Sequence, residues 1–118
     1  MTRAPRDDVA LLRDILKSAE AALRFAEGLD ERAFLASELH QQAIIRAIGI
    51  VGEAAWRMTP GFKAAHADVP WQAMAGMRHR IVHDYADVDL DLVWRVVVHE
   101  LPPLVSRLRP LVPRDESA

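Results

Sequence analysis

The chain has 118 residues, 51% of them hydrophobic, no cysteine and a formal net charge of −2 at pH 7. That length and apolar fraction fit one folded domain with a single core, and the lack of cysteine excludes disulfide scaffolds, thiol catalysis and thiolate zinc sites. No apolar run is long enough to span a membrane, and acidic residues stand where a signal peptide would be basic and apolar, so we expect a cytoplasmic protein.

Helical periodicity runs through the first half of the chain. Apolar residues recur at three- and four-residue steps over residues 9–26, after acidic residues that favour a helix N-terminus. Residues 28–30 end this helix, and a short helix over residues 31–36 follows. A longer helix is predicted from about residue 37 to 58, where the sequence Thr-Pro-Gly stops it.

The third quarter of the chain predicts one more long helix. A short helical turn over residues 62–65 comes first. The next helix runs from about residue 70 to 83, and its start is marked by an aspartate two residues before a proline. Residues 84–89 form a polar connection.

A last helix is predicted from about residue 89 to 109, kinked or split at Pro102-Pro103 because a proline removes a backbone donor. The three valines at 96–98 would suit a strand, but the helical spacing around them favours a buried helix. The sequence therefore predicts an all-α antiparallel bundle of four main helices with one or two short ones. Residues 1–110 would form one domain and residues 111–118 a flexible tail.

Charge is distributed unevenly along the chain. Residues 40–83 carry five Lys/Arg against two Asp/Glu and four of the five histidines, whereas both flanking segments are acidic. A short chain shows such fluctuations by chance. The asymmetry therefore matters only if the middle segment also contains chemistry.

The densest cluster of reactive side chains lies at residues 78–85. Guanidinium matches two phosphate oxygens with its planar fork, and histidine titrates near neutral pH. Together they suffice for metal-free RNA cleavage: the histidine removes the proton of a 2′-hydroxyl or protonates the leaving 5′-oxygen, while the arginine stabilises charge on the phosphate. The cluster comprises Arg78, His79, Arg80, His83, Asp84 and Tyr85.

Two other interpretations of the cluster stay open. His79 and His83 are four residues apart on a helix, so they could hold a metal ion if a third ligand came from elsewhere. The cluster is equally compatible with a structural helix end, in which Arg80 pairs with Asp84 and Tyr85 is half-buried.

The helical geometry of the cluster also leaves a choice. On a regular helix Arg78 and Tyr85 lie on nearly the same side, whereas His83 is turned by about 140° from Arg78. Either the helix ends near His83, or a second copy of the chain completes the site.

The pattern Arg78-x-x-x-x-His83-x-Tyr85 resembles the signature of the HepT-like toxins, which belong to the HEPN superfamily of all-helical ribonucleases. The similarity is not confined to the motif and covers most of residues 9–109, in order and with family-like spacing. The flanking segments that carry it are residues 43–48, 52–55, 70–71, 76–78, 88–94 and 101–102.

This resemblance implies a HEPN-like helical fold and a homodimer in which the motifs of both subunits face one cleft. It further implies an endoribonuclease that needs neither a metal ion nor another cofactor and that cuts tRNA or mRNA. The catalytic pair would be Arg78 and His83, and the residues that position RNA would be His79 and Arg80. The supporting residues would be Arg46 and Glu53.

The family is typically the toxin half of a toxin–antitoxin pair, so the resemblance also implies a cognate minimal nucleotidyltransferase as antitoxin. That partner would transfer AMP from ATP to Tyr85. A bulky, anionic nucleotide beside Arg78 and His83 would then repel the RNA phosphates.

The chain departs from the family pattern at two positions of the central helix. Gly49 stands where the family commonly has an acidic residue, one turn before Glu53, which either orients a histidine or pairs with Arg57. Trp56 stands where a charged residue is expected, and it is either a core residue or part of a partner surface. The alternative function is therefore a catalytically silent HEPN-type binding module, or an adaptor for the nucleotidyltransferase.

Overall fold

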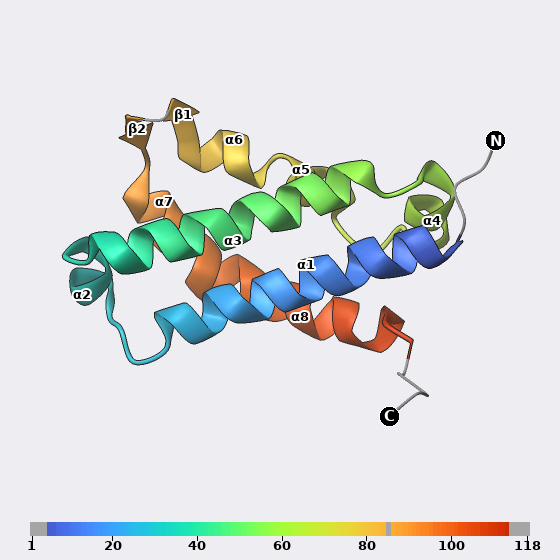
Figure 1. Ribbon diagram of the computed structural model, residues 1–118, viewed down its shortest axis with the longest axis horizontal. Helices are drawn as coiled ribbons and strands as arrows, with labels where there is room; N and C mark the ends of the chain where they lie inside the picture. The colour runs from blue at the N-terminus through green and yellow to red at the C-terminus, as the bar shows by residue number, and fades with distance from the viewer. Residues whose placement is uncertain (1–4, 85, 114–118) are drawn as a thin grey trace.

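Two long helices, α1 (Pro5–Ala26) and α3 (Glu38–Arg57), pack against each other along the molecule (Figure 1). The computed structural model describes residues 5–84 and 86–113. The carboxylate of Asp8, in the first turn of α1, is buried and accepts hydrogen bonds from the backbone N–H (3.0 Å) and the hydroxyl (2.6 Å) of Thr59. This contact fastens the beginning of α1 to the chain just beyond the end of α3.

The first half of the chain follows the sequence prediction closely. The short helix α2 (Glu31–Leu35) is capped by Asp30, whose side chain accepts from the N–H of Ala33. The helices α3 and α4 (Pro60–Ala65) are capped in the same way by Ser37 and Thr59. Side-chain oxygens therefore satisfy N–H groups that have no partner within the helix at these three starts.

The helix predicted over residues 70–83 is divided and shorter than expected. The structure has two helices of five residues, α5 (Trp71–Ala75) and α6 (Met77–Ile81), which meet at Gly76. Glycine is a poor helix former, because it loses more backbone freedom than other residues, and the interruption falls on it. The prediction of one continuous helix was wrong here.

The residues after α6 form a small hairpin where only a polar connection was predicted. Strands β1 (Val82–Asp84) and β2 (Asp87–Val88) pair antiparallel, with Val82 opposite Val88. β-Branched residues favour such cross-strand pairing. The Asp84 carboxylate accepts the N–H of Ala86 at 2.8 Å and stabilises the turn.

The last helical segment continues through its two prolines. It consists of α7 (Leu90–Arg95), a π-helical turn (Val96–Glu100), α8 (Leu101–Leu108) and a 3₁₀ turn (Arg109–Leu111). Pro102 and Pro103 have no N–H to donate to the preceding turn, and the chain accommodates them by the wider π-helical turn. The predicted disruption therefore lies one turn before the prolines.

The C-terminal end packs further than the predicted domain boundary at residue 110. Leu111 and Val112 lie against the core, and the guanidinium of Arg13 donates to the backbone carbonyl of Pro113 at 3.1 Å. The rest of the predicted tail, residues 114–118, lies outside the described residues.

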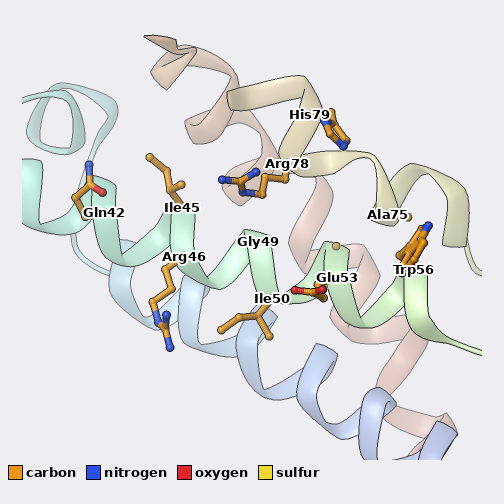
Figure 2. Close-up of a pocket in the computed structure, with 11 residues that line it drawn as sticks. Gln42, Ile45, Arg46, Gly49, Ile50, Glu53, Trp56, Ala75, Arg78 and His79 are labelled. Atoms are coloured by element: carbon orange, nitrogen blue, oxygen red, sulfur yellow. The ribbon is translucent and has the colours of Figure 1, made fainter. Parts of the chain in front are cut away.

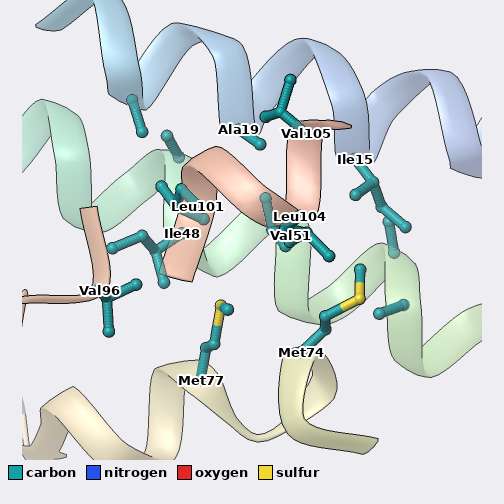
Figure 3. Packing of buried hydrophobic residues seen from close by; sticks show 14 of the residues in the cluster. Ile15, Ala19, Ile48, Val51, Met74, Met77, Val96, Leu101, Leu104 and Val105 are labelled. Carbon is teal, nitrogen blue, oxygen red and sulfur yellow. The ribbon is translucent and has the colours of Figure 1, made fainter. Parts of the chain in front are cut away.

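One hydrophobic core lies between α1, α3, the α5–α6 pair and α8 (Figure 3). The molecule is mostly α-helical, as predicted, with the hairpin as its small β component. Among the described residues, none of the helices combines the length and the apolar character of a membrane span. The core includes Ile15, Ala19, Ile48, Val51, Met74, Met77, Val96, Leu101, Leu104 and Val105.

Candidate functional site

The short helix α6 carries the centre of the predicted motif. Its residues Met77 and Ile81 are four apart and buried in the core, with 3% and 0% of their surface exposed. Because these two side chains share one face, the intervening Arg78, His79 and Arg80 are turned outward and are exposed. The apolar spacing of α6 therefore presents three basic or titratable side chains to solvent.

A pocket of about 580 Å³ lies between α3 and the α5–α6 pair (Figure 2). Its floor is the outer face of α3, and small residues, Gly49, Gly52 and Ala75, keep it open. Two arginines against one glutamate give its lining a net positive charge with histidine neutral. The polar and aromatic side chains that line it are Gln42, Arg46, Glu53, Trp56, Arg78 and His79.

Arg78 lies across Gly49 in this pocket. A Cβ atom placed on Gly49 would be 3.6 Å from the Cδ and 3.9 Å from the Nε of Arg78. At Gly49 this chain therefore has no side chain to face the guanidinium. The side chain of Arg78 takes part in none of the ion pairs or hydrogen bonds found among the described residues. Its guanidinium is available to an anion that enters the pocket.

Arg80 has a different environment on the other side of α6. Two residues along a helix correspond to a turn of about 200°. The guanidinium of Arg80 donates to both carboxylate oxygens of Glu100, in the π-helical turn, at 2.9 and 3.0 Å. This hydrogen bonding raises the pKa of Arg80, and partial burial opposes the rise. The alternative pairing of Arg80 with Asp84 was wrong.

His83 lies beyond the end of the helix. It is exposed on β1, and the pocket beside Arg78 is lined by His79 rather than by His83. The structure thus brings Arg78 and His79 together with Arg46 and Glu53 and leaves His83 on the hairpin. Of the two possibilities left open by the sequence, the helix does end before His83.

Two further predictions concern this region. Because α6 ends at Ile81, His79 and His83 do not share a helix face as a metal-binding pair would. Within residues 5–84 and 86–113, no group of three His, Asp or Glu side chains is placed to hold a metal ion. Tyr85, the predicted site of AMP transfer, lies outside the described residues.

The exposed face of α3 was not predicted as part of the site, apart from Arg46 and Glu53. Trp56 exposes 72% of its surface, so its interpretation as a core residue was wrong. Glu53 also lines, with Arg57, a smaller depression on the side of α1. The sequence did contain a signal, because alternating steps of three and four residues mark one helix face. The positions at this spacing are 39, 42, 46, 49, 53 and 56.

The chain matches known proteins over almost its whole length. The family model described as "Ribonuclease HepT-like" matches residues 15–111. A protein of Thermococcus cleftensis named "Probable ribonuclease HepT" is 33% identical over 111 residues, which cover 94% of this chain and 98% of that protein. "Putative RNase MJ1380" of Methanocaldococcus jannaschii is 34% identical over 99 residues, covering 84% and 91%. No solved structure gives a significant match.

Proposed function

Because this chain belongs to the HepT-like ribonuclease family, we propose that its ribonuclease activity resides in the pocket between α3 and α6 and requires no metal ion. The observation that carries this proposal is the guanidinium of Arg78, which lies in that pocket without an acidic partner among the described residues. A planar guanidinium is suited to bind two oxygens of one RNA phosphate.

The reaction we propose is attack of an RNA 2′-hydroxyl on the adjacent phosphorus. As the P–O2′ bond forms and the P–O5′ bond breaks, a 2′,3′-cyclic phosphate results, the 2′-hydroxyl loses its proton to a base and the leaving 5′-oxygen gains one from an acid. The imidazole of His83 fills one of these two roles and a water molecule the other. Arg78 stabilises the negative charge that develops on the phosphate oxygens. His79, exposed at the pocket, positions the RNA strand, and Arg46 and Glu53 support the site from α3.

We propose that the active form is a homodimer. His83 lies on the hairpin, and it is His79 that lines the pocket of Arg78 within one chain. Two copies facing each other across their pockets would gather both pairs of Arg78 and His83 in one cleft. Leu39, 77% exposed on α3, is apolar surface that a second copy would cover.

We further propose that the protein is the toxin of a toxin–antitoxin pair in the cytoplasm, with tRNA or mRNA as its substrate. Its antitoxin would be a nucleotidyltransferase that transfers AMP from ATP to Tyr85 and releases pyrophosphate. Tyr85 follows His83 by two residues in the chain, so an attached nucleotide would bring negative charge close to the catalytic histidine.

The test is cleavage of tRNA and mRNA by the purified full chain in the presence of a chelator. We expect wild type to cut and His83→Ala to lose about 10²–10⁴-fold in rate, because the general acid–base group is gone. His99→Ala, which removes another exposed histidine, is the matched control and should cut like wild type. Activity that disappears with chelator would contradict the metal-independent reaction.

The same set of variants separates a ribonuclease toxin from a binding module. Expression without the antitoxin should arrest growth for wild type and not for His83→Ala. After co-expression with the nucleotidyltransferase, the intact mass should increase by AMP units, and Tyr85→Phe should prevent this. Modification of a protein that cuts no RNA would support the adaptor function instead.

A further inference from the structure

Trp56, in the last turn of α3, is an aromatic side chain left in water. It exposes 72% of its surface, although burying a side chain of this size is ordinarily favourable. A single exposed apolar residue needs no explanation by itself. Trp56, however, lines the same pocket as Arg78 and His79.

The position of Trp56 relative to Arg78 is set by close packing of two helices. A Cβ atom on Gly52 would lie only 3.2 Å from the carbonyl oxygen of Met74 and 3.5 Å from that of Ala75. The absence of a side chain at Gly52 thus lets α5 approach α3 directly. This contact fixes the α5–α6 pair, which carries Arg78, against the helix that carries Trp56.

The indole of Trp56 lines the pocket at a different position from the guanidinium of Arg78. Figure 2 shows Trp56 at one end of the pocket near Ala75, while the Arg78 guanidinium points over Gly49 toward the other end. Trp56 follows Gly49 by seven positions, which corresponds to a rise of about 10 Å along α3. A flat apolar surface and an exposed guanidinium therefore lie in one pocket, at positions about two helical turns apart along α3.

We propose that Trp56 is a stacking platform for an unpaired nucleobase next to the phosphate held by Arg78, and that it makes the enzyme selective for single-stranded RNA. The inference rests on the proposed function of this pocket. A base can lie on an aromatic side chain only if it is splayed out of a duplex. The net positive lining, from Arg46 and Arg78 against Glu53, attracts the strand that carries the base.

The charges around Trp56 favour RNA over a protein as its occupant. The centre of a protein–protein interface is depleted of charged residues, and Trp56 shares its pocket with Arg78, His79 and Glu53. Leu39, the exposed apolar residue at the other end of α3, lies outside this pocket and is the better candidate for contact with a second copy.

The test is binding of a labelled single-stranded oligonucleotide of about ten 2′-deoxynucleotides, a length typical of such sites. Without 2′-hydroxyl groups it is bound and not cut. For Trp56→Leu we expect the dissociation constant to rise about 5- to 100-fold, and for Trp56→Phe to stay close to wild type, because phenylalanine also stacks. A duplex of the same sequence should bind equally to all three proteins.

Phe25→Leu is the matched control, since it replaces an exposed aromatic residue on α1 by leucine, as Trp56→Leu does on α3. It should bind the single strand like wild type. The near-ultraviolet signal of Trp71 and Trp94 reports whether each variant is folded. The inference is overturned if folded Trp56→Leu binds the single strand like wild type. It is also overturned if Trp56→Phe loses as much affinity for the single strand as Trp56→Leu, or if Trp56→Leu converts a dimer to a monomer in sedimentation.

Failure of this inference is distinguishable from failure of the proposed function. If His83→Ala abolishes RNA cleavage while Trp56→Leu binds the single strand normally, only the stacking platform is wrong. If His83→Ala cuts RNA like wild type, the proposed catalytic pair is wrong, whatever Trp56 contributes to binding.

Discussion

The two sides of α6 differ in what they offer to the arginines they carry. On one side Arg80 donates to both oxygens of Glu100 and is held in a defined position. On the other side Arg78 extends over Gly49 into an open pocket and takes part in no ion pair among the described residues. The two residues are of the same type, two positions apart, on a helix of five residues.

The difference indicates which arginine is free for chemistry. A guanidinium that already binds a carboxylate with two hydrogen bonds must give up that partner before it can bind a phosphate. The guanidinium of Arg78, which lies above Gly49, gives up only bound water when it binds a phosphate. We therefore propose that Arg78 rather than Arg80 binds the phosphate, while the positioning of RNA by Arg80, which the resemblance implies, stays a prediction.

The largest effect that tests this comparison is loss of activity in Arg78→Ala. Removing a group that stabilises charge on the reacting phosphate typically costs about 10²–10³-fold in rate. Arg78→Lys should recover little, because an ammonium group does not reproduce the two-pronged geometry. Arg80→Ala should cost less than about tenfold, since it acts through the position of α6. The measurement is the rate of RNA cleavage at saturating RNA.

The comparison fails if Arg80→Ala is as inactive as Arg78→Ala while both proteins remain folded. That result would mean that Arg80 leaves Glu100 when RNA binds. Double substitution of Arg80 and Glu100 then decides the matter, because a residue that contacts RNA stays essential after its resting partner has been removed.

An intermediate effect comes from the two glycines of α3 that face the pocket. In Gly52→Ala the new Cβ would lie 3.2 Å from a backbone carbonyl oxygen of α5, so we expect the free energy of unfolding to fall by about 1–3 kcal/mol. In Gly49→Ala the atom nearest the new Cβ is the Cδ of the flexible Arg78 side chain, 3.6 Å away. The higher helix propensity of alanine should therefore raise the free energy of unfolding by up to about 1 kcal/mol. Urea unfolding of both variants measures the contrast.

Equal stability of the two alanine variants would contradict the close contact between α3 and α5. In that event the packing at Gly52 could not be what fixes Arg78 against α3. The cleavage rate should show the same contrast. We expect Gly52→Ala to lower the rate, because it moves α5 away from α3, and Gly49→Ala to keep it, because the Arg78 guanidinium stays in place.

The helices of the first half were predictable because their ends are local features. Asp30 was predicted as a cap, residue 37 as the start of the long helix and Thr59 as part of its stop, and all three prove to cap a helix. The break at Gly76 was less visible, because a single glycine inside a helical pattern is often tolerated. The hairpin after Ile81 was missed, since two strands of three and two residues give too little alternation to detect.

The candidate site was predictable in its residue types and not in its partners. Arg78, His79 and His83 stood out by their density, and helical angles already separated His83 from Arg78. Glu100 could not be assigned to Arg80 from the sequence, because it lies 20 residues away and reaches α6 only through the π-helical turn. The exposure of Trp56 was missed, although its spacing along α3 places it on the same helix face as Arg46 and Glu53.

The smallest effect is expected for Glu100→Gln, which removes the partner of Arg80 and keeps its shape. The two side chains are 41% and 36% exposed, so the pair should contribute less than about 1 kcal/mol to the free energy of unfolding. Because the hydrogen bonds to Glu100 raise the pKa of Arg80 above its ordinary value, the contribution of the protonated guanidinium is present below that ordinary pKa and is lost only as the pH rises through the raised one. Salt is therefore the better variable. The stability difference between wild type and Glu100→Gln should disappear near 1 M salt, where exposed charges are screened within about 3 Å.

The rate of RNA cleavage by Glu100→Gln should stay near that of wild type, because the buried side chains of Met77 and Ile81 still hold α6 against the core. A loss of activity as large as that of Arg78→Ala would instead make the Arg80–Glu100 pair the element that holds α6 in its active position.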